Sequence, residues 1–292
     1  MVAKRRSTNT PPGAAVEPRT LYVVSTPIGN LADASFRALQ VLRDVQIVLA
    51  EDTRQTRVLF DRYDLRTPMQ SLHEHNEATS VAGVLKRLSG GDSIAIVSDA
   101  GTPLISDPGE RLVRAVWEAG FRVVPIPGPT AMAAALAAAG METARFTFFG
   151  FLPKTGRERT DALRELSVMP HTGVVYESPE RVVKTLLALV ELGCGQREAV
   201  VARELTKRFE EFKRGTVSSL ATYYDSSPPR GEVVLLIEGR REPPVDEVDE
   251  MKLRDRVRAM RAAGATTRDI TSVLVTEYGV ARNYAYRLAH DA

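Results

Sequence analysis

The chain has 292 residues, which predicts about two domains and enough length to bury a sizeable core. Lys and Arg total 39 against 37 Asp and Glu, a formal net charge of +2, so the chain as a whole is not a polybasic binder. Its only cysteine, Cys194, excludes an internal disulfide and multi-cysteine metal sites, as is typical of cytoplasmic proteins. No apolar run approaches the roughly 20 residues of a membrane helix, so no membrane partner is expected.

Composition divides the chain into five stretches. Residues 1–18 are basic and then rich in Ser, Thr, Pro and Gly, without the apolar segment of a signal peptide, which predicts a disordered tail. Residues 19–128 and 129–240 are expected to form an N-terminal and a C-terminal α/β domain. Residues 241–250 are typical of a linker, and residues 251–292 are expected to form a small, basic helical appendage.

Residues 19–128 alternate apolar runs with helix-period patterns, which predicts a parallel α/β sheet. The expected strands are residues 21–24, 46–50, 94–97 and 122–126. One helix is expected after Asp33 as its N-cap, and a second over residues 81–88. A third is expected after Asp107 as N-cap, with Pro108 at its first position.

Residues 129–240 show fewer helix patterns between their strands, which predicts a mixed, partly antiparallel sheet. The expected strands are residues 146–149, 173–176, 199–202 and 232–237. One helix is expected, capped by Ser178, opened by Pro179 and ended by Gly193. The predicted fold class is therefore α/β, with two α/β domains followed by helices.

Residues 251–292 are predicted to form three short helices, the second of which begins at Thr266 with Asp269 at its N3 position. Eight Lys or Arg residues against four Asp or Glu residues give this segment a formal charge of +4. Contact with RNA is one interpretation, and a packing or dimerisation appendage is another. A DNA-binding helix-turn-helix fits the rest of the chain less well, so no DNA partner is expected.

Signatures of several other chemistries are absent or weak. No Walker A motif occurs, and the Gly-Cys-Gly turn at Cys194 lacks the third glycine of a dinucleotide fingerprint. The motif His73-Glu74-His75 has no evident third ligand, so it is interpreted as a polar loop and no metal is expected. Cys194 has no paired histidine motif and is not expected to be a nucleophile.

Three Gly- and Pro-rich loops follow predicted parallel strands, at residues 25–30, 98–109 and 127–131. Ligands of open α/β sheets bind outside the carboxyl ends of the strands. Glycines let the backbone approach a ligand closely, and prolines stiffen the loops. Any one of these loops is better explained as an ordinary turn, but three such loops at strand ends predict a ligand site.

Eight sequence blocks carry a resemblance to a known family. They are Leu21-Tyr22-Val23-Val24-Ser25-Thr26-Pro27-Ile28-Gly29-Asn30-Leu31, Glu51-Asp52-Thr53-Arg54, Ser98-Asp99-Ala100-Gly101-Thr102-Pro103, Pro127-Gly128-Pro129-Thr130-Ala131, Phe149-Gly150-Phe151-Leu152-Pro153, Glu177-Ser178-Pro179-Glu180-Arg181, Ala202-Arg203-Glu204-Leu205-Thr206-Lys207 and Gly231-Glu232. In these blocks, within residues 21–239, the chain resembles the bacterial ribosomal RNA small-subunit methyltransferase I family of the tetrapyrrole methylase superfamily.

The resemblance implies two α/β domains, S-adenosylmethionine in the cleft between them, and a homodimer. It also implies 2′-O-methylation of a cytidine ribose in the decoding region of 16S ribosomal RNA in the small ribosomal subunit. Tetrapyrrole-methylating relatives carry Gly-Asp-Pro where this chain has Asp99-Ala100-Gly101-Thr102-Pro103, which favours the RNA branch. Two alternatives stay open: a tetrapyrrole (porphyrin or corrin) methyltransferase, and a non-catalytic ribosome-assembly protein that binds RNA.

Motif position implies which residues contact the methyl donor. They are Pro27 and Gly29 on one wall, Asp99, Gly101, Thr102, Leu104 and Ile105 on another, Thr130, Ala131 and Met132 at a helix start, and Tyr176, Leu205 and Gly231 on the adenine side. Guanidinium groups suit phosphate oxygens, so we expect RNA contacts from a set of arginines that are equally well explained as surface or salt-bridge residues. These arginines are Arg54, Arg57, Arg181 and Arg203.

Methyl transfer from a sulfonium needs the acceptor oxygen in line with the methyl group and the sulfur, so positioning is expected to supply much of the acceleration. The ribose hydroxyl must also lose its proton, which a positioned base assists. The resemblance does not identify this base, and our hypothesis is a catalytic set of Lys154, Glu204 and Lys207, in which burial lowers a lysine pKa. In the alternative, both lysines bind phosphate and Glu204 forms a structural ion pair.

Overall fold

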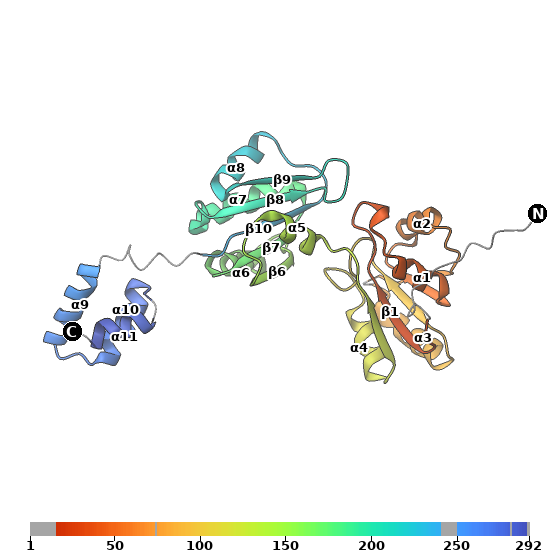
Figure 1. The fold of residues 1–292 in the computed structure, drawn as a ribbon, viewed down its shortest axis with the longest axis horizontal. Helices are drawn as coiled ribbons and strands as arrows, with labels where there is room; N and C mark the ends of the chain where they lie inside the picture. The colour runs from red at the N-terminus through yellow and green to blue at the C-terminus, as the bar shows by residue number, and fades with distance from the viewer. Residues whose placement is uncertain (1–15, 74, 241–249, 281, 291–292) are drawn as a thin grey trace, which may run out of the picture. The chain divides into compact units, whose positions relative to one another are not determined.

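The computed structural model describes residues 16–73, 75–240, 250–280 and 282–290 (Figure 1). The chain forms two compact units, a larger one up to Glu238 and a smaller one that contains residues 168–170 and the chain from Gly239 onward. The predicted linker lies almost wholly outside the described residues, as does most of the predicted N-terminal tail. The boundary expected near residue 128 stays a prediction, although one sheet of the larger unit ends before it and the other begins after it.

The first sheet is parallel throughout, as predicted, with strand order β3-β2-β4-β1-β5. Its strands are β1 (Thr20–Val24), β2 (Ile47–Ala50), β3 (Met69–Ser71), β4 (Ile94–Val97) and β5 (Arg122–Ile126). The three-residue edge strand β3 was not predicted, because it is too short to show a period. All five carboxyl ends meet at one edge, so the loops that follow the strands gather there.

Helices cover both faces of this sheet (Figure 1). They are α1 (Phe36–Asp44), α2 (Thr53–Arg62), α3 (Glu77–Ser89) and α4 (Glu110–Glu118). Leu42 of α1 and Phe60 of α2 pack on one face, whereas Leu88 of α3 and Leu112 of α4 pack on the other. Because both faces are buried, the central strands are almost entirely apolar.

Two predicted helix caps were wrong. The side chain of Ser35, not Asp33, accepts the capping hydrogen bond of α1, and Asp33 lies in a preceding 3-10 turn. Helix α4 begins after Gly109, which has φ +126° and provides no side-chain cap. A Cβ at Gly109 would lie 2.7 Å from Cδ1 of Ile96, so the chain enters α4 in a conformation and a space that only glycine suits. Asp107 is therefore outside the helix.

The second sheet is mixed, as predicted, with strand order β6-β7-β10-β8-β9. Its strands are β6 (Phe146–Phe151), β7 (Thr172–Glu177), β8 (Glu198–Arg203), β9 (Glu211–Thr216) and β10 (Val233–Ile237). Only the β6–β7 pair is parallel. The edge strand β9 was not predicted because its sequence is largely polar.

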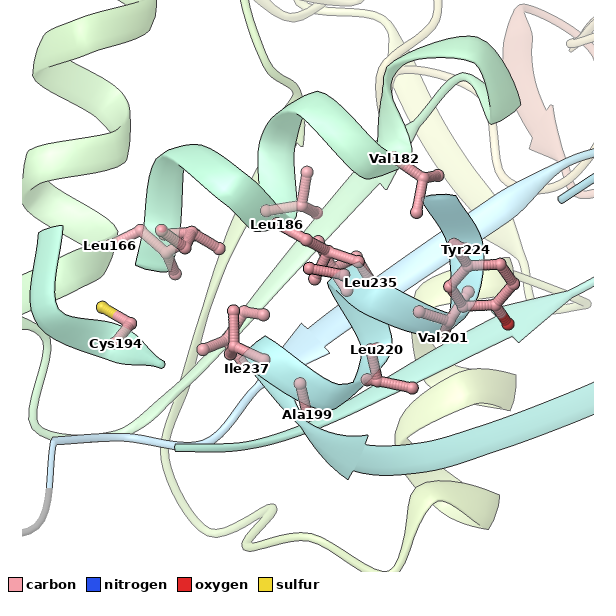
Figure 2. Close-up of a cluster of buried hydrophobic side chains, with 14 of the residues drawn as sticks. Leu166, Val182, Leu186, Cys194, Ala199, Val201, Leu220, Tyr224, Leu235 and Ile237 are labelled. Atoms are coloured by element: carbon pink, nitrogen blue, oxygen red, sulfur yellow. The ribbon is translucent and has the colours of Figure 1, made fainter. Parts of the chain in front are cut away.

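Helices also cover the second sheet on both faces. They are α5 (Ala131–Ala139), α6 (Gly156–Val168), α7 (Val182–Leu189) and α8 (Val217–Ser226). Figure 2 shows the cluster on the face opposite α5, where Leu186 of α7 and Leu220 of α8 pack with strand residues such as Leu235. Ser178 and Pro179 open a 3-10 turn rather than α7 itself, and Gly193 ends the helical segment at φ +83°.

The smaller unit consists of α9 (Glu250–Ala262), α10 (Thr267–Tyr278) and α11 (Arg282–His290), which confirms the predicted three helices. The Thr266 side chain and Asp269 form the expected capping box at the start of α10. Leu253, Ile270 and Leu288 belong to a core within this unit. No helix among the described residues is long and apolar enough to span a membrane.

Candidate active site

The loops after β1 and β4 are joined by a short antiparallel bridge. The backbone N–H of Thr26 donates to the carbonyl of Gly101 at 2.8 Å, and the N–H of Gly101 donates back to Thr26 at 3.1 Å. The Thr26 hydroxyl donates to the carbonyl of Ser98 at 3.1 Å and is buried. These bonds hold two loops that lie 70 or more residues apart in the sequence at one end of the sheet.

The loop after β5 joins the same network through Thr102. The hydroxyl of Thr102 lies 2.9 Å from that of Ser25 and 3.2 Å from the carbonyl of Pro129, to which it can donate. All three loops singled out from the sequence therefore meet at the carboxyl edge of the first sheet.

Loops from the two sheets touch at Gly29. A Cβ on this glycine would lie 2.6 Å from Cγ of Lys207 and 3.0 Å from the backbone oxygen of Leu205. The neighbouring Ile28 is buried in a cluster with Leu205 and Val234 of the second sheet region. The β1 loop thus packs directly on the loop that follows β8.

A cavity of about 400 Å³ lies where these loops converge, within the range of about 300–1,000 Å³ common for small-molecule sites. Nine of the thirteen predicted donor contacts line it: Asp99, Gly101, Thr102, Ile105, Thr130, Ala131, Tyr176, Leu205 and Gly231. Further lining residues were not predicted, including Ile28, Glu51, Ser106, Asp107, Phe151, Glu177, Ser178, Glu232 and Val234.

Four predicted contacts do not line the cavity, although each is next to a residue that does. Pro27 and Gly29 flank Ile28, and Leu104 precedes Ile105. The side chain of Leu104 lies beside Gly109 instead. The backbone N–H of Met132 donates to the Tyr176 hydroxyl at 3.0 Å, which ties the start of α5 to β7.

Two apolar cavity residues are each flanked by residues with left-handed backbone conformations. Leu104 (φ +72°) and Ser106 (φ +69°) flank Ile105, and Glu204 (φ +51°) and Thr206 (φ +64°) flank Leu205. A non-glycine residue at positive φ is strained and persists where its surroundings hold it, often at a functional site.

Three carboxyl groups line one wall of the cavity: Glu51, Asp99 and Asp107. Burial raises the pKa of Asp107 to about 7, with a further contribution from Glu51. Burial also raises the pKa values of Glu51 and Asp99. Glu51 and Asp107 were not predicted as site residues: Asp107 fits a helix cap, and Glu51 was noted only as part of the block Glu51-Asp52-Thr53-Arg54, with no contact assigned to it.

On the second-sheet side, the carboxylate of Glu177 is fully buried and paired. Arg181 lies 2.6 Å from it, Arg159 lies 3.7 Å away, and the Thr185 hydroxyl donates to it at 2.6 Å. Arg181 also donates to the carbonyl of Leu152 at 3.0 Å. Its guanidinium is thus occupied by structural contacts, so the expected RNA role of Arg181 gains no geometric support.

The other predicted RNA contacts differ in their surroundings. Arg54 is 89% exposed and pairs with Asp52 at 2.6 Å, and Arg57 is exposed one turn later on α2. Arg203 pairs with Glu211 across the β8–β9 hairpin. Lys154 is exposed in the connection between β6 and α6 and does not line the cavity.

Glu204 and Lys207 form a network at the edge of the cavity. The Lys207 ammonium donates to Glu204 at 2.8 Å and to Glu232 at 3.1 Å. Burial acts to lower the pKa of Lys207, but the hydrogen bonds to both carboxylates outweigh it, so the pKa is raised. The pKa of Glu204 is lowered, first by its hydrogen bond from Lys207. These directions oppose the hypothesis of a desolvated lysine base and match the ion-pair alternative.

No group of three or more His, Cys, Asp and Glu side chains within the described ranges could hold a metal ion. His73 and His75 have ring centres 6.0 Å apart, and Glu74 between them lies outside the described residues.

Comparison with known proteins identifies the family. The profile of tetrapyrrole (corrin/porphyrin) methylases matches residues 20–221. A ribosomal RNA small subunit methyltransferase I from Mesorhizobium japonicum is 46% identical over 246 residues, 83% of each chain. The protein of that name from Synechocystis is 42% identical and covers 92% of this chain and 96% of its own.

The chain belongs to the ribosomal RNA small subunit methyltransferase I family. Among solved structures, a cobalt precorrin-4 methyltransferase matches 75% of this chain and 95% of its own with a TM-score of 0.59, at 19% identity. That likeness concerns the fold alone. Methyltransferases of this family and fold use S-adenosylmethionine as methyl donor.

The residues of the cavity fit this donor. Its sulfonium and ammonium groups are positive, and the wall of Glu51, Asp99 and Asp107 is acidic. Apolar residues such as Ile28 and Leu205 offer surface for an adenine ring. When S-adenosylmethionine is bound in this cavity, it supplies an activated methyl group. The protein supplies the position of the reactants and the charge around them.

Gly29→Ala is expected to weaken donor binding at least tenfold, because its Cβ would push Lys207 and the backbone of Leu205 away from the β1 loop. Isothermal titration with S-adenosylmethionine measures the change. Gly83→Ala is the matched control, since its Cβ on α3 meets nothing within 4 Å. Equal dissociation constants for Gly29→Ala and wild type would contradict the contact between the two loops.

Asp107→Asn is expected to change how stability depends on pH. Because the folded pKa of Asp107 is about 7 against an ordinary value of 3.8, the folded state holds this proton up to about pH 7, whereas the unfolded state has lost it by then. The stabilisation that comes from keeping Asp107 protonated in the folded state is complete below about pH 4. It is lost as the pH rises to about 7.

Urea unfolding at pH 5 and pH 8 tests this expectation. The loss of stability between the two pH values should be smaller in Asp107→Asn than in wild type. Asp225→Asn, an exposed carboxylate on α8, serves as the control and should follow wild type. An unchanged pH dependence in Asp107→Asn would show that the carboxyl group is not desolvated.

Proposed function

We propose that this protein methylates small-subunit ribosomal RNA, and that the acceptor is the ribose 2′-hydroxyl of a cytidine in the decoding region of 16S RNA. One observation carries the proposal: the cavity at the carboxyl edge of the first sheet is lined by residues from all eight blocks that resemble the family. Relatives that span most of the chain bear the name ribosomal RNA small subunit methyltransferase.

The proposed partners are the small ribosomal subunit, or its RNA, and a second copy of the chain, in the cytoplasm. Support for RNA comes from the names of the relatives and from exposed arginines such as Arg54 and Arg57 on α2. Support for the homodimer comes from the family resemblance alone. Lys154 and Lys207 remain proposed contacts for phosphate.

For the chemistry, we infer that the Asp107 carboxylate takes the proton of the 2′-hydroxyl. The oxygen–methyl bond forms as the methyl–sulfur bond breaks, and S-adenosylhomocysteine leaves. Asp107 is favoured over Lys207 because Asp107 lines the cavity and Lys207 is held between two carboxylates. Burial of Asp107 also raises its pKa to about 7, which suits a base that works near neutral pH.

Transfer of labelled methyl groups tests the proposed function. Acceptors are undermodified small ribosomal subunits, naked small-subunit RNA and a reduced porphyrinogen. Label in the ribose of a cytidine is expected from the subunit or its RNA. Label in the porphyrinogen alone would make the protein a tetrapyrrole methyltransferase, and donor binding without any transfer would favour a non-catalytic assembly protein.

Asp107→Asn is expected to lower kcat by about 10²–10⁴, the usual contribution of a positioned base. In wild type, kcat should rise with pH through about 7 as Asp107 loses its proton, and this rise should vanish in the variant. Donor affinity, measured separately, should fall less than kcat, because Glu51 and Asp99 keep the wall acidic. A variant that keeps wild-type kcat and the same pH profile would exclude Asp107 as the base.

A further inference from the structure

A second cavity, of about 300 Å³, adjoins the donor cavity and has no role so far. It is lined by Arg203, Glu204, Phe209 and Arg230. Leu205, the residue after Glu204, and Gly231, the residue after Arg230, both line the donor cavity. Neighbouring residues of two chain segments therefore face the two cavities, so a ligand in the second one lies beside the methyl donor.

Phe209 gives this second cavity an aromatic surface. Its side chain lies in the loop between β8 and β9 and is 64% exposed, although a large apolar ring gains free energy when it is covered. The Arg208 guanidinium lies 5.5 Å from the ring centre. This pairing of an aromatic face with a guanidinium is the chemistry on which unstacked nucleobases bind.

Positive charge around the cavity is only partly neutralised. Arg203 pairs with Glu211, and Lys207 pairs with Glu204 and Glu232. In the described part of the chain, by contrast, the Arg230 guanidinium has neither a hydrogen bond nor an ion pair. An unpaired guanidinium beside an aromatic ring suits the phosphate of a nucleotide whose base lies on that ring.

The loop that carries Phe209 is held in place before any ligand arrives. Glu204 and Thr206 adopt positive φ, and the Glu204 carboxylate accepts hydrogen bonds from Lys207 and from the backbone of Glu232. Glu210 accepts a hydrogen bond from the backbone N–H of Thr206 at 2.6 Å. A preformed loop loses little conformational entropy on binding, which favours a specific ligand over a chance contact.

We propose that the cavity of Arg203, Glu204, Phe209 and Arg230 binds a nucleotide adjacent to the methylated one, with its base stacked on Phe209 and its phosphate on Arg230. This inference rests on the proposed RNA substrate and names the side chains that position it. The ligand class is single-stranded RNA, because a base can reach Phe209 only when it is unpaired from a helix.

The test compares Phe209→Ala, Phe209→Trp and wild type in binding to fluorescently labelled small-subunit RNA and in methyl transfer to undermodified small subunits. Phe209→Ala should raise the dissociation constant and KM for RNA about tenfold, the loss of one stacked base. Phe209→Trp should stay within about threefold of wild type because it keeps a stacking face. Affinity for S-adenosylmethionine should be unchanged in both.

Arg230→Ala provides a second readout. It should reduce the slope of log affinity against log salt concentration by about 0.7, the value for one phosphate contact on a single strand. Phe36→Ala, which removes a 90% exposed ring from α1, is the matched control and should bind RNA like wild type.

The outcomes separate this inference from the proposed function. If wild type methylates RNA and Phe209→Ala binds and methylates RNA equally well, the nucleotide site is overturned and the proposed function stands. Loss of RNA and donor affinity together in Phe209→Ala would also overturn it, since the loop would then be merely structural. Wild type that transfers methyl groups to no RNA, and binds none, would overturn both proposals.

Discussion

The pair of backbone hydrogen bonds between Thr26 and Gly101 is the contact on which the site depends. Parallel strands deliver their loops to one edge of the sheet, but that alone leaves the loops free to diverge. The bridge joins the β1 and β4 loops, Thr102 extends the network to the β5 loop, and Gly29 brings the Leu205 loop of the second sheet against them. The cavity exists because these four loops are held together.

The acidic side chains on the two sides of the cavity differ in whether a cationic side chain pairs with them. On the second-sheet side each acid has a cationic partner: Glu177 pairs with Arg181, and Glu204 pairs with Lys207. On the first-sheet side Glu51, Asp99 and Asp107 are crowded together, and burial raises their pKa values. A buried acid without a cation is costly unless a positive ligand or a proton neutralises it. The sulfonium of the methyl donor is such a positive ligand, and the acceptor hydroxyl is a source of such a proton.

Patterns with a strong local cause were predictable from the sequence. The three central strands of the first sheet, β1, β2 and β4, are largely apolar because both faces are buried. The capping box at Thr266 depends on residues three positions apart. Side-chain partners were not predictable. Asp107 has the local sequence of a helix cap, yet α4 begins only after Gly109, and the Asp107 carboxyl group lies in the cavity wall instead. Lys207 is held by Glu232, which is 25 residues away in the chain. Helix α6 was missed because its exposed face is highly charged.

A crystal structure of the full chain with S-adenosylhomocysteine tests the central claim most directly. We expect the bound product to lie between the start of α5 at Thr130 and the loops at Leu205 and Gly231, with its sulfur facing Asp107. The Thr26–Gly101 bridge should be unchanged by binding. Product bound away from this cavity, or with its sulfur facing away from the acidic wall, would contradict both the donor site and the proposed base.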